Sequence, residues 1–331
     1  MRCPKCECKQ RYSKACPICK YQHVLDPTTS GGLTDYNLKM RLEKISQSGT
    51  VHLTLRQLYA SYRNKYKKNS GVVPLTLAAF SGVLVFFAFN PWVGAIMVIL
   101  FSGAAYAESK RKPWLSITQF NNLFERWYVN STVTDSAKTM VLGAELQALP
   151  AKSLEQDIYD YGVEAVIVTD QDIYVDLFVK NNYHTQYKAL IVSKNLYPDY
   201  LQPRLESILA EKSDLPLFFI HDATIEGMQT IEQFKNITTL NTTGHPCIDL
   251  GLMPKHFARL KPLKKLKVDI DDTYAPLDYL QHKHFTAIFN KCIVERAEQQ
   301  ALLNDEELNT VDAEGLTSRV LMSDLVDYDF G

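Results

Sequence analysis

The most pronounced feature of the hydrophobic pattern is an apolar stretch at residues 71–107, which contains no charged side chain. It is too long for one membrane-spanning helix, which needs about 20 residues. The pair Asn90-Pro91 divides it into two segments, residues 72–89 and 92–107, because proline interrupts a helix and asparagine tolerates turn geometry. The pattern predicts a two-helix transmembrane hairpin, with a buried hairpin in the core of a soluble protein as the alternative.

Basic residues flank this stretch on both sides, and no apolar segment typical of a signal peptide precedes it. They are Arg63, Lys65, Lys67 and Lys68 before it and Lys110, Arg111 and Lys112 after it. Cytoplasmic flanks of membrane spans are enriched in Lys and Arg, and two spans return the chain to the side that it left. We therefore expect a two-pass protein of the cell (inner) membrane, with both termini in the cytoplasm and the lipid bilayer as a partner.

Further along the chain, three apolar runs alternate with segments of helical spacing. The runs cover residues 163–170, 187–193 and 215–222, and the helical segments cover residues 171–183 and 200–212. Aliphatic strands that alternate with helices are typical of a parallel sheet covered on both faces. The pattern predicts a three-layer, Rossmann-like α/β domain. Functional side chains gather at the carboxyl ends of such strands, where this sequence has Thr169-Asp170, Ser193-Lys194 and His221-Asp222.

The N-terminus contains two Cys-x-x-Cys pairs, Cys3 with Cys6 and Cys16 with Cys19, each with proline after its first cysteine. Such a turn can direct two thiolates at one metal ion, and tetrahedral Zn²⁺ takes four such ligands. The spacing resembles the small zinc ribbons at the N-termini of many bacterial membrane proteins. A closed four-thiolate site has no open coordination position, so we expect a structural or partner-binding zinc site and not a catalytic one.

Other uses of these cysteines stay open at this point. A disulfide pair conflicts with the reducing cytoplasm expected for this end of the chain, and a thioredoxin-like site needs a surrounding βαβ unit that the N-terminus lacks. An iron–sulfur site is a further alternative to zinc. Cys8 is an additional thiol to which we assign no ligand role, and Cys247 and Cys292 are expected to be ordinary buried residues.

Charge is distributed unevenly, although the 36 basic and 37 acidic side chains nearly balance. Residues 1–70 hold 14 Lys and Arg against 4 Asp and Glu, whereas residues 304–331 hold eight acidic side chains and only Arg319 as a basic one. A basic segment attracts anionic lipid headgroups or nucleic acid, and charge alone does not choose between them. The acidic tail can dock on its own domain or serve as a partner-binding peptide.

The α/β segment also carries a partial resemblance, over residues 160–255. Tyr197-Pro198-Asp199 follows the second apolar run, Asp222 ends the third, and Gly227 and Gly251-Leu252 come after it. This order resembles the Toprim domain of the topoisomerase VI A subunit. The resemblance implies carboxylates at the strand ends that hold Mg²⁺ for chemistry on a phosphate.

The sequence departs from that family at the positions that matter for Mg²⁺. The family's glutamate falls on Thr169, next to Asp170, and its second metal-binding aspartate falls on Thr224. Two neutral threonines predict a degenerate site, since a hard cation prefers charged oxygen ligands. If the domain is active, its candidate catalytic residues are Asp170, Asp222 and Glu226.

These features predict a multi-domain membrane protein with six segments. They are a zinc ribbon (1–25), a linker with juxtamembrane helices (26–70), the transmembrane hairpin (71–107), a helical connector (108–155), the Toprim-like domain (156–290) and a helix with an acidic tail (291–331). We expect a membrane-anchored cytoplasmic adaptor or sensor without catalysis, with structural zinc and a protein partner, for which the product of a neighbouring gene is a candidate. The alternatives are a Mg²⁺-dependent nuclease or phosphotransfer enzyme at the membrane and a nucleic-acid tether that uses the basic N-terminal segment. The sequence does not indicate the oligomeric state.

Overall fold

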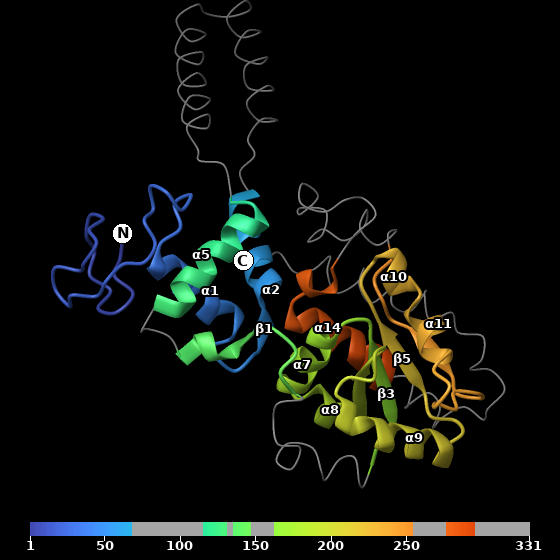
Figure 1. Cartoon of the computed structure of the whole chain (residues 1–331). Coiled ribbons are helices and arrows are strands. Elements are labelled where there is room, and N and C mark those ends of the chain that lie inside the picture. The colour runs from blue at the N-terminus through green and yellow to red at the C-terminus, as the bar shows by residue number, and fades with distance from the viewer. Residues whose placement is uncertain (68–114, 131–134, 147–161, 254–275, 295–331) are drawn as a thin grey trace, which may run out of the picture. The chain divides into compact units, whose positions relative to one another are not determined.

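The computed structural model describes residues 1–67, 115–130, 135–146, 162–253 and 276–294 (Figure 1). The chain divides into two compact units. The ribbon unit comprises Met1–Leu38 and Tyr62–Ser131, and the sheet unit comprises Lys39–Ser61 and Thr132–Gly331. Two helices, α1 (Asp35–Ile45) and α2 (Leu55–Lys67), contribute residues to both units.

The ribbon unit contains the cysteine-rich segment and α5 (Ile117–Asn130). A capping box begins α5: the Ser116 hydroxyl accepts a hydrogen bond from the Gln119 N–H at 3.2 Å, and the Gln119 side chain accepts one from the Ser116 N–H at 3.1 Å. The buried face of α5 has helical spacing and consists of Phe120, Phe124 and Trp127. The rings of Phe120 and Tyr62 lie 5.2 Å apart, so α5 packs against the end of α2.

The sheet unit is built on four parallel strands in the order β4-β3-β5-β6. They are β3 (Ala165–Thr169), β4 (Ala189–Ser193), β5 (Leu217–Ile220) and β6 (Cys247–Asp249). Thr169 at the end of β3 is in register with Ser193 on one side and with Ile220 on the other. Because β3 lies between the next two strands of the chain, its carboxyl end is the position where open α/β sheets bind ligands.

Helices cover both faces of this sheet (Figure 1). One face packs its valine, leucine and phenylalanine side chains against Leu205 and Ile208 of α9 (Gln202–Glu211) and Phe234 of α11 (Thr230–Lys235). The other face packs against α7 (Asp172–Lys180) and α8 (Tyr183–Gln186), and Phe178 of α7 contacts α14 (His282–Phe289). The predicted α/β domain with a parallel sheet is confirmed. Its strands are buried on both faces, which explains their near-continuous apolar runs.

Shorter elements complete the sheet unit. They are the parallel pair β1 (Leu53–Thr54) and β2 (Met140–Val141), α10 (Ile225–Met228), the 3₁₀ turns η1 (Asp135–Thr139), η3 (Asp199–Leu201) and η4 (Leu277–Tyr279), and the π-helical turn η5 (Asn290–Val294). The Thr54 hydroxyl donates to Asp278 at 2.9 Å, and the Gln57 amide donates to the Leu280 carbonyl at 2.6 Å. These bonds fasten the start of α2 to the segment around η4.

The membrane prediction needs correction. The predicted hairpin at residues 71–107 lies outside the described residues. Among the described residues, no helix combines the length and the apolar composition that crossing a bilayer requires. The longest of them, α5, has 14 residues, which gives a rise of about 21 Å against a hydrocarbon core of about 30 Å. The predicted fold class and location, those of a two-pass inner-membrane protein, are therefore corrected to what these residues show: an α/β domain with a parallel sheet and a cysteine cluster.

Candidate metal centre and polar strand ends

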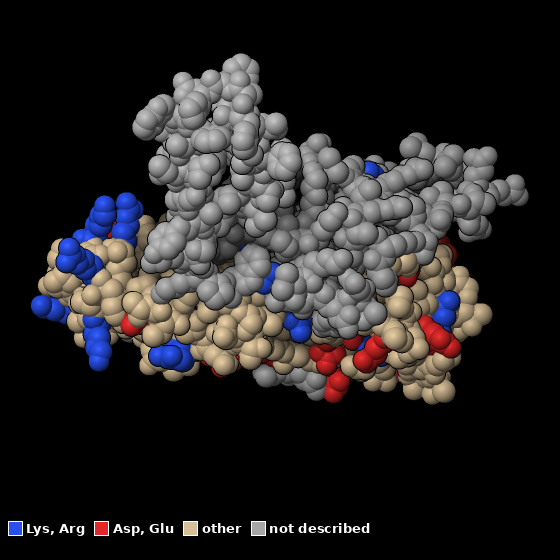
Figure 2. All heavy atoms as spheres, turned by 90° about the horizontal axis from the view of Figure 1, so that it is seen from above, with Lys and Arg blue, Asp and Glu red and all other residues tan. Residues whose placement is uncertain are grey.

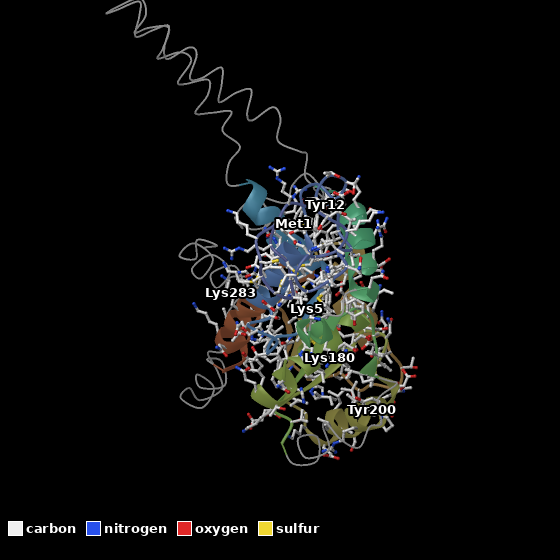
Figure 3. The ribbon with its side chains drawn as sticks, turned by 90° about the vertical axis from the view of Figure 1, so that its left-hand side faces the viewer. Met1, Lys5, Tyr12, Lys180, Tyr200 and Lys283 are labelled. Carbon is white, nitrogen blue, oxygen red and sulfur yellow. The ribbon has the colours of Figure 1, made fainter. Side chains whose placement is uncertain are left out.

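The four cysteines of the two Cys-x-x-Cys pairs come together in the ribbon unit, and their sulfur atoms all lie within 4.8 Å of one another. Cys3 Sγ lies 3.5 Å from Cys19 Sγ, and Cys6 Sγ lies 3.7 Å from Cys16 Sγ. Four thiolates at the Zn–S bond length of about 2.3 Å form a tetrahedron with edges of about 3.8 Å. The donor set and its spacing therefore fit a zinc ion. Figure 3 draws the side chains with sulfur in yellow and labels Lys5, which lies between the first two cysteines in the sequence.

The backbone of each Cys-x-x-Cys turn positions its sulfur atoms. In the first turn, the Glu7 N–H donates to the Cys3 carbonyl at 3.0 Å, and Glu7 has a positive φ of 57°. In the second turn, the Lys20 N–H donates to the Cys16 carbonyl at 3.0 Å, and Lys20 has a positive φ of 59°. The two turns thus have the same geometry and present their cysteines in the same way.

Backbone amides near the sulfur atoms favour thiolates, which are the form that binds metal. Burial raises the pKa of Cys3 to about 12, although the N–H groups of Cys6 and Lys5 act in the opposite direction. At Cys16, burial is outweighed by N–H groups of Cys19 and Ile18 together with neighbouring thiols, and the pKa falls to about 6. The N–H groups around Cys16 therefore favour its thiolate, the form that binds metal.

The ribbon is attached to α1 through Asp35, a residue that the sequence did not single out. Its buried carboxylate accepts hydrogen bonds from the N–H groups of Val24 and Leu25, both at 2.9 Å, and lies 3.4 Å from His23 Nδ1. Burial raises the pKa of Asp35, and the bonds from Val24 and Leu25 oppose that shift. An aspartate at the start of a helix, 16 residues after the last cysteine of the second pair, gives no sequence signal for this contact.

In the sheet unit, Asp170 and Asp222 lie together at the carboxyl ends of β3 and β5. The Asp222 N–H donates to Asp170 Oδ2 at 3.0 Å, while Asp170 Oδ1 has no hydrogen-bond partner among the described residues. Burial raises the pKa of Asp170. For Asp222, burial and the nearby charge of Asp170 raise the pKa to about 7. Two buried carboxyl groups side by side resist double ionisation.

Both oxygens of Asp222 are already engaged within the protein. Oδ1 accepts hydrogen bonds from the Tyr174 hydroxyl and the Leu277 N–H, both at 2.6 Å. Oδ2 accepts one from the Gln171 amide at 2.5 Å. Asp222 therefore joins the end of β5 to α7 and to the segment that begins η4.

His221, which precedes Asp222, is also held on both sides of its ring. Nδ1 lies 2.7 Å from the Asp222 carbonyl oxygen, which can only accept, so Nδ1 carries a hydrogen. Nε2 lies 3.1 Å from the Asp249 carboxylate, and Gly251 packs so closely on the ring that a Cβ there would meet it at 2.2 Å. Burial lowers the pKa of His221, but Asp249 outweighs that effect and the net shift is upward.

Comparisons with protein-family models, curated proteins and solved structures found no match. No family match supports the Toprim resemblance, which therefore rests on the residues quoted for it. The site has to be interpreted from its own geometry.

The structure does not bring Glu226, the third candidate catalytic residue, together with Asp170 and Asp222. It lies on α10 with 78% of its side chain exposed, and its carboxylate pairs with Lys194 at 2.9 Å. Thr224 caps α10, accepting a hydrogen bond from the Gly227 N–H at 2.8 Å. The position of the family's second metal ligand is thus occupied by a helix cap.

Within the described residues, the cysteine cluster is the one group of three or more potential ligand side chains placed to hold a metal ion. The four predicted zinc ligands are brought together. Mg²⁺ receives no support from the carboxylates at the strand ends. Cys8, which the sequence pattern does not mark as a ligand, lies beside the cluster, with its sulfur 3.3 Å from that of Cys6 and 3.5 Å from that of Cys16.

Proposed function

We propose that the chain is a non-catalytic adaptor, in which a zinc-bound ribbon and an α/β domain present binding surfaces to a partner protein. The observation that carries this proposal is the engagement of Asp222 by three donors of its own chain. An enzyme that uses Mg²⁺ needs carboxylate oxygens free to face the metal. Asp222 lies where such an enzyme would have a metal ligand, but its carboxylate makes the hydrogen bonds of a structural residue.

The energetic cost of converting Asp222 into a metal ligand supports the same conclusion. A cation on Asp222 would displace the hydroxyl of Tyr174 and the N–H of Leu277, and both are buried. A buried donor left without an acceptor costs about 1–3 kcal/mol. Glu226 and Thr224 add no compensating ligand, because one pairs with Lys194 and the other caps α10.

The cysteine centre supports a binding role for a different reason. Four thiolates complete the coordination of zinc, so a substrate finds no open position on the metal. A segment of about 25 residues buries too little apolar surface to fold without such a staple. We infer that zinc is a structural cofactor that maintains the ribbon for contact with a partner.

We further infer that the α/β domain is a degenerate relative of the Toprim domain. The support is the strand order β4-β3-β5-β6, with Asp222 at the end of β5 and Gly227 in the following turn. Gly227 is required there, because a Cβ would meet the Asp222 carbonyl oxygen at 2.3 Å. Thr169 and Thr224 stand where that family has acidic metal ligands.

Calorimetric titration of the full-length chain with Mg²⁺ separates adaptor from enzyme. Asp170→Asn and Glu226→Gln serve as variants, because both preserve side-chain shape and neither removes a donor to the Asp222 carboxylate. We expect no specific binding tighter than millimolar and no cleavage of a DNA duplex or a simple phosphodiester by any of the three proteins. Submillimolar binding that disappears in Asp170→Asn, together with phosphodiester cleavage, would overturn the proposal.

A second candidate function, nucleic-acid binding, is favoured by the surface of the ribbon. Its first 25 residues expose six basic side chains and only Glu7 as an acidic one: Arg2, Lys5, Lys9, Arg11, Lys14 and Lys20. Figure 2 shows a group of Lys and Arg side chains at the left-hand end of the view. Zinc with four thiolates lowers the net charge of this segment by about two, and it remains positive. A polyanion is the partner that such a surface attracts.

Fluorescence anisotropy with labelled single-stranded and double-stranded DNA tests this candidate. The variant Lys9→Ala/Lys14→Ala is compared with Lys188→Ala/Lys235→Ala, which removes the same charge from exposed positions of the sheet unit. Binding through the ribbon predicts weaker affinity and a shallower salt dependence only for the first variant. Equal effects of both variants would mean that the binding is non-specific attraction to positive charge.

A further inference from the structure

A fifth sulfur atom, that of Cys8, lies beside the group of four cysteines at the metal centre. Cys8 Sγ lies 3.3 Å from Cys6 Sγ and 3.5 Å from Cys16 Sγ, and Cys6 Sγ lies 3.7 Å from Cys16 Sγ. These three distances form a nearly equilateral triangle. Each side is close to the edge of about 3.8 Å expected for a zinc–thiolate tetrahedron. Cys8 is therefore as close to Cys16 as the fourth ligand, Cys6, is.

The two halves of the ribbon have the same pattern of backbone hydrogen bonds. Comparing them shows how Cys8 differs from its counterpart in the second half. The Cys3 N–H donates to the Cys8 carbonyl at 3.1 Å, and the Cys16 N–H donates to the Tyr21 carbonyl at 2.8 Å. Isolated antiparallel bridges follow at Arg2↔Lys9 and Ala15↔Gln22. Cys8 thus occupies the position that Tyr21 occupies in the second half. The first half has a thiol where its counterpart has a buried ring.

Cys6 and Cys8 differ in their exposure to solvent. Cys6 is exposed, whereas Cys8 is half-buried and Cys16 is buried. Besides the two sulfur atoms, the thiol of Cys8 has a long contact of 3.9 Å to the side-chain oxygen of Gln10. A contact of this length is weak, so moving the thiol of Cys8 toward the metal costs little.

We propose that Cys8 is a fifth ligand that exchanges with Cys6 at one coordination position of the zinc, while Cys3, Cys16 and Cys19 hold the other three. In the exchange, the bond from zinc to Cys6 breaks and a bond from zinc to Cys8 forms. The proton of the Cys8 thiol passes to the departing Cys6 thiolate, so charge and atoms balance. One thiol at the centre is always free and in contact with the bound ligands. This proposal rests on the zinc centre alone and is independent of the adaptor function.

The test compares zinc binding by the full-length chain in four variants. They are Cys6→Ser, Cys8→Ser, Cys6→Ser/Cys8→Ser and Cys16→Ser. Zinc content is measured by elemental analysis, and relative affinity by competition with a chromogenic chelator. Cys6→Ser and Cys8→Ser should each retain about one zinc per chain, with affinity reduced by no more than about tenfold. The double variant and Cys16→Ser should lose at least about a hundredfold.

Cobalt substitution adds a readout of how many thiolates bind. The thiolate-to-cobalt charge-transfer band of Cys6→Ser should keep the intensity of the unmodified chain, because Cys8 takes the vacant position. Metal loss by Cys6→Ser as complete as that of Cys16→Ser would overturn the proposal. A cobalt band in Cys6→Ser that corresponds to three thiolates would overturn it as well.

Alkylation of the zinc-loaded chain tests the exchange without any substitution. Trypsin cuts after Lys5 and Lys9, so Cys6 and Cys8 remain together on one short peptide and fragment spectra show which of them is labelled. Exchange predicts a single label that is divided between Cys6 and Cys8. A label confined to Cys8 would mean that Cys6 never leaves the metal and would contradict the proposal.

Discussion

Asp222 shows how a single side chain can have the position of a catalytic residue and the contacts of a structural one. It follows β5, where open α/β sheets place functional groups, yet its carboxylate joins three segments of its own chain. The sequence indicated its position, because strand ends can be located from apolar runs. The sequence could not indicate the role of Asp222. Its donor Leu277 is distant in the sequence, and a backbone N–H is not visible in the hydrophobic pattern.

Replacing Asp222 by alanine should destabilise the sheet unit by about 2–4 kcal/mol, because Tyr174 and Leu277 keep buried donors without an acceptor. Asp222→Asn is the matched control. It retains an oxygen for these two donors, so we expect a smaller loss. Urea denaturation monitored by far-UV circular dichroism measures both. A loss below about 0.5 kcal/mol in Asp222→Ala would contradict the anchoring role.

The ring of His221 should make stability depend on pH. Its pKa in the folded chain is raised above 6.5 by Asp249, while Asp170 lies nearby with a like effect. The stabilisation is therefore fully present below pH 6.5 and is lost as the pH rises through the higher folded value. NMR titration of the His221 ring, with Asp249→Asn as the control, measures the pKa directly. A value at or below that of the control would contradict the ion pair.

At the scale of elements, the sheet unit was largely predictable and the connections around it were not. Three apolar runs were enough to predict β3, β4 and β5, because strands buried on both faces consist almost entirely of aliphatic residues. β1 and β2 have two residues each and pair across a long sequence separation, so no local pattern indicates them. The turn after β5 depends on Thr224 and Gly227, whose roles follow only from the close packing there.

Gly227→Ala should therefore destabilise the sheet unit by about 2 kcal/mol or more, because the new methyl group would overlap the Asp222 carbonyl oxygen. Gly143→Ala is a suitable control, since nothing lies within 4 Å of a Cβ at that position. Thermal unfolding of the two variants compares them under the same conditions. Similar midpoints for both would show that the turn after β5 relaxes without cost.

At the scale of the whole molecule, the apolar composition of one segment led to a prediction that needs correction, whereas the spacing of the cysteines predicted the observed cluster. The charge-free stretch at residues 71–107 predicted a membrane class that the described helices do not support. The zinc ligands were predictable because four sulfur atoms in two short turns need little else of the fold. Cys8 was missed because its place beside Cys6 depends on the left-handed backbone of Glu7 and on the repeat of the two turns.

The two units should respond differently to metal removal. A strong chelator should abolish amide protection in residues 1–34, where the thiolates hold the chain together, and leave β3, β4 and β5 protected by their own core. Hydrogen–deuterium exchange read out by mass spectrometry resolves the two regions. Unchanged exchange in the ribbon after complete metal removal would show that the ribbon folds without metal.

X-ray absorption at the zinc edge of the purified protein tests the closed zinc centre most directly. A structural zinc centre predicts about one zinc per chain, surrounded by four sulfur atoms at about 2.3 Å and by no oxygen or nitrogen ligand. Iron in place of zinc, or a zinc shell that includes oxygen or nitrogen, would contradict the closed four-thiolate centre.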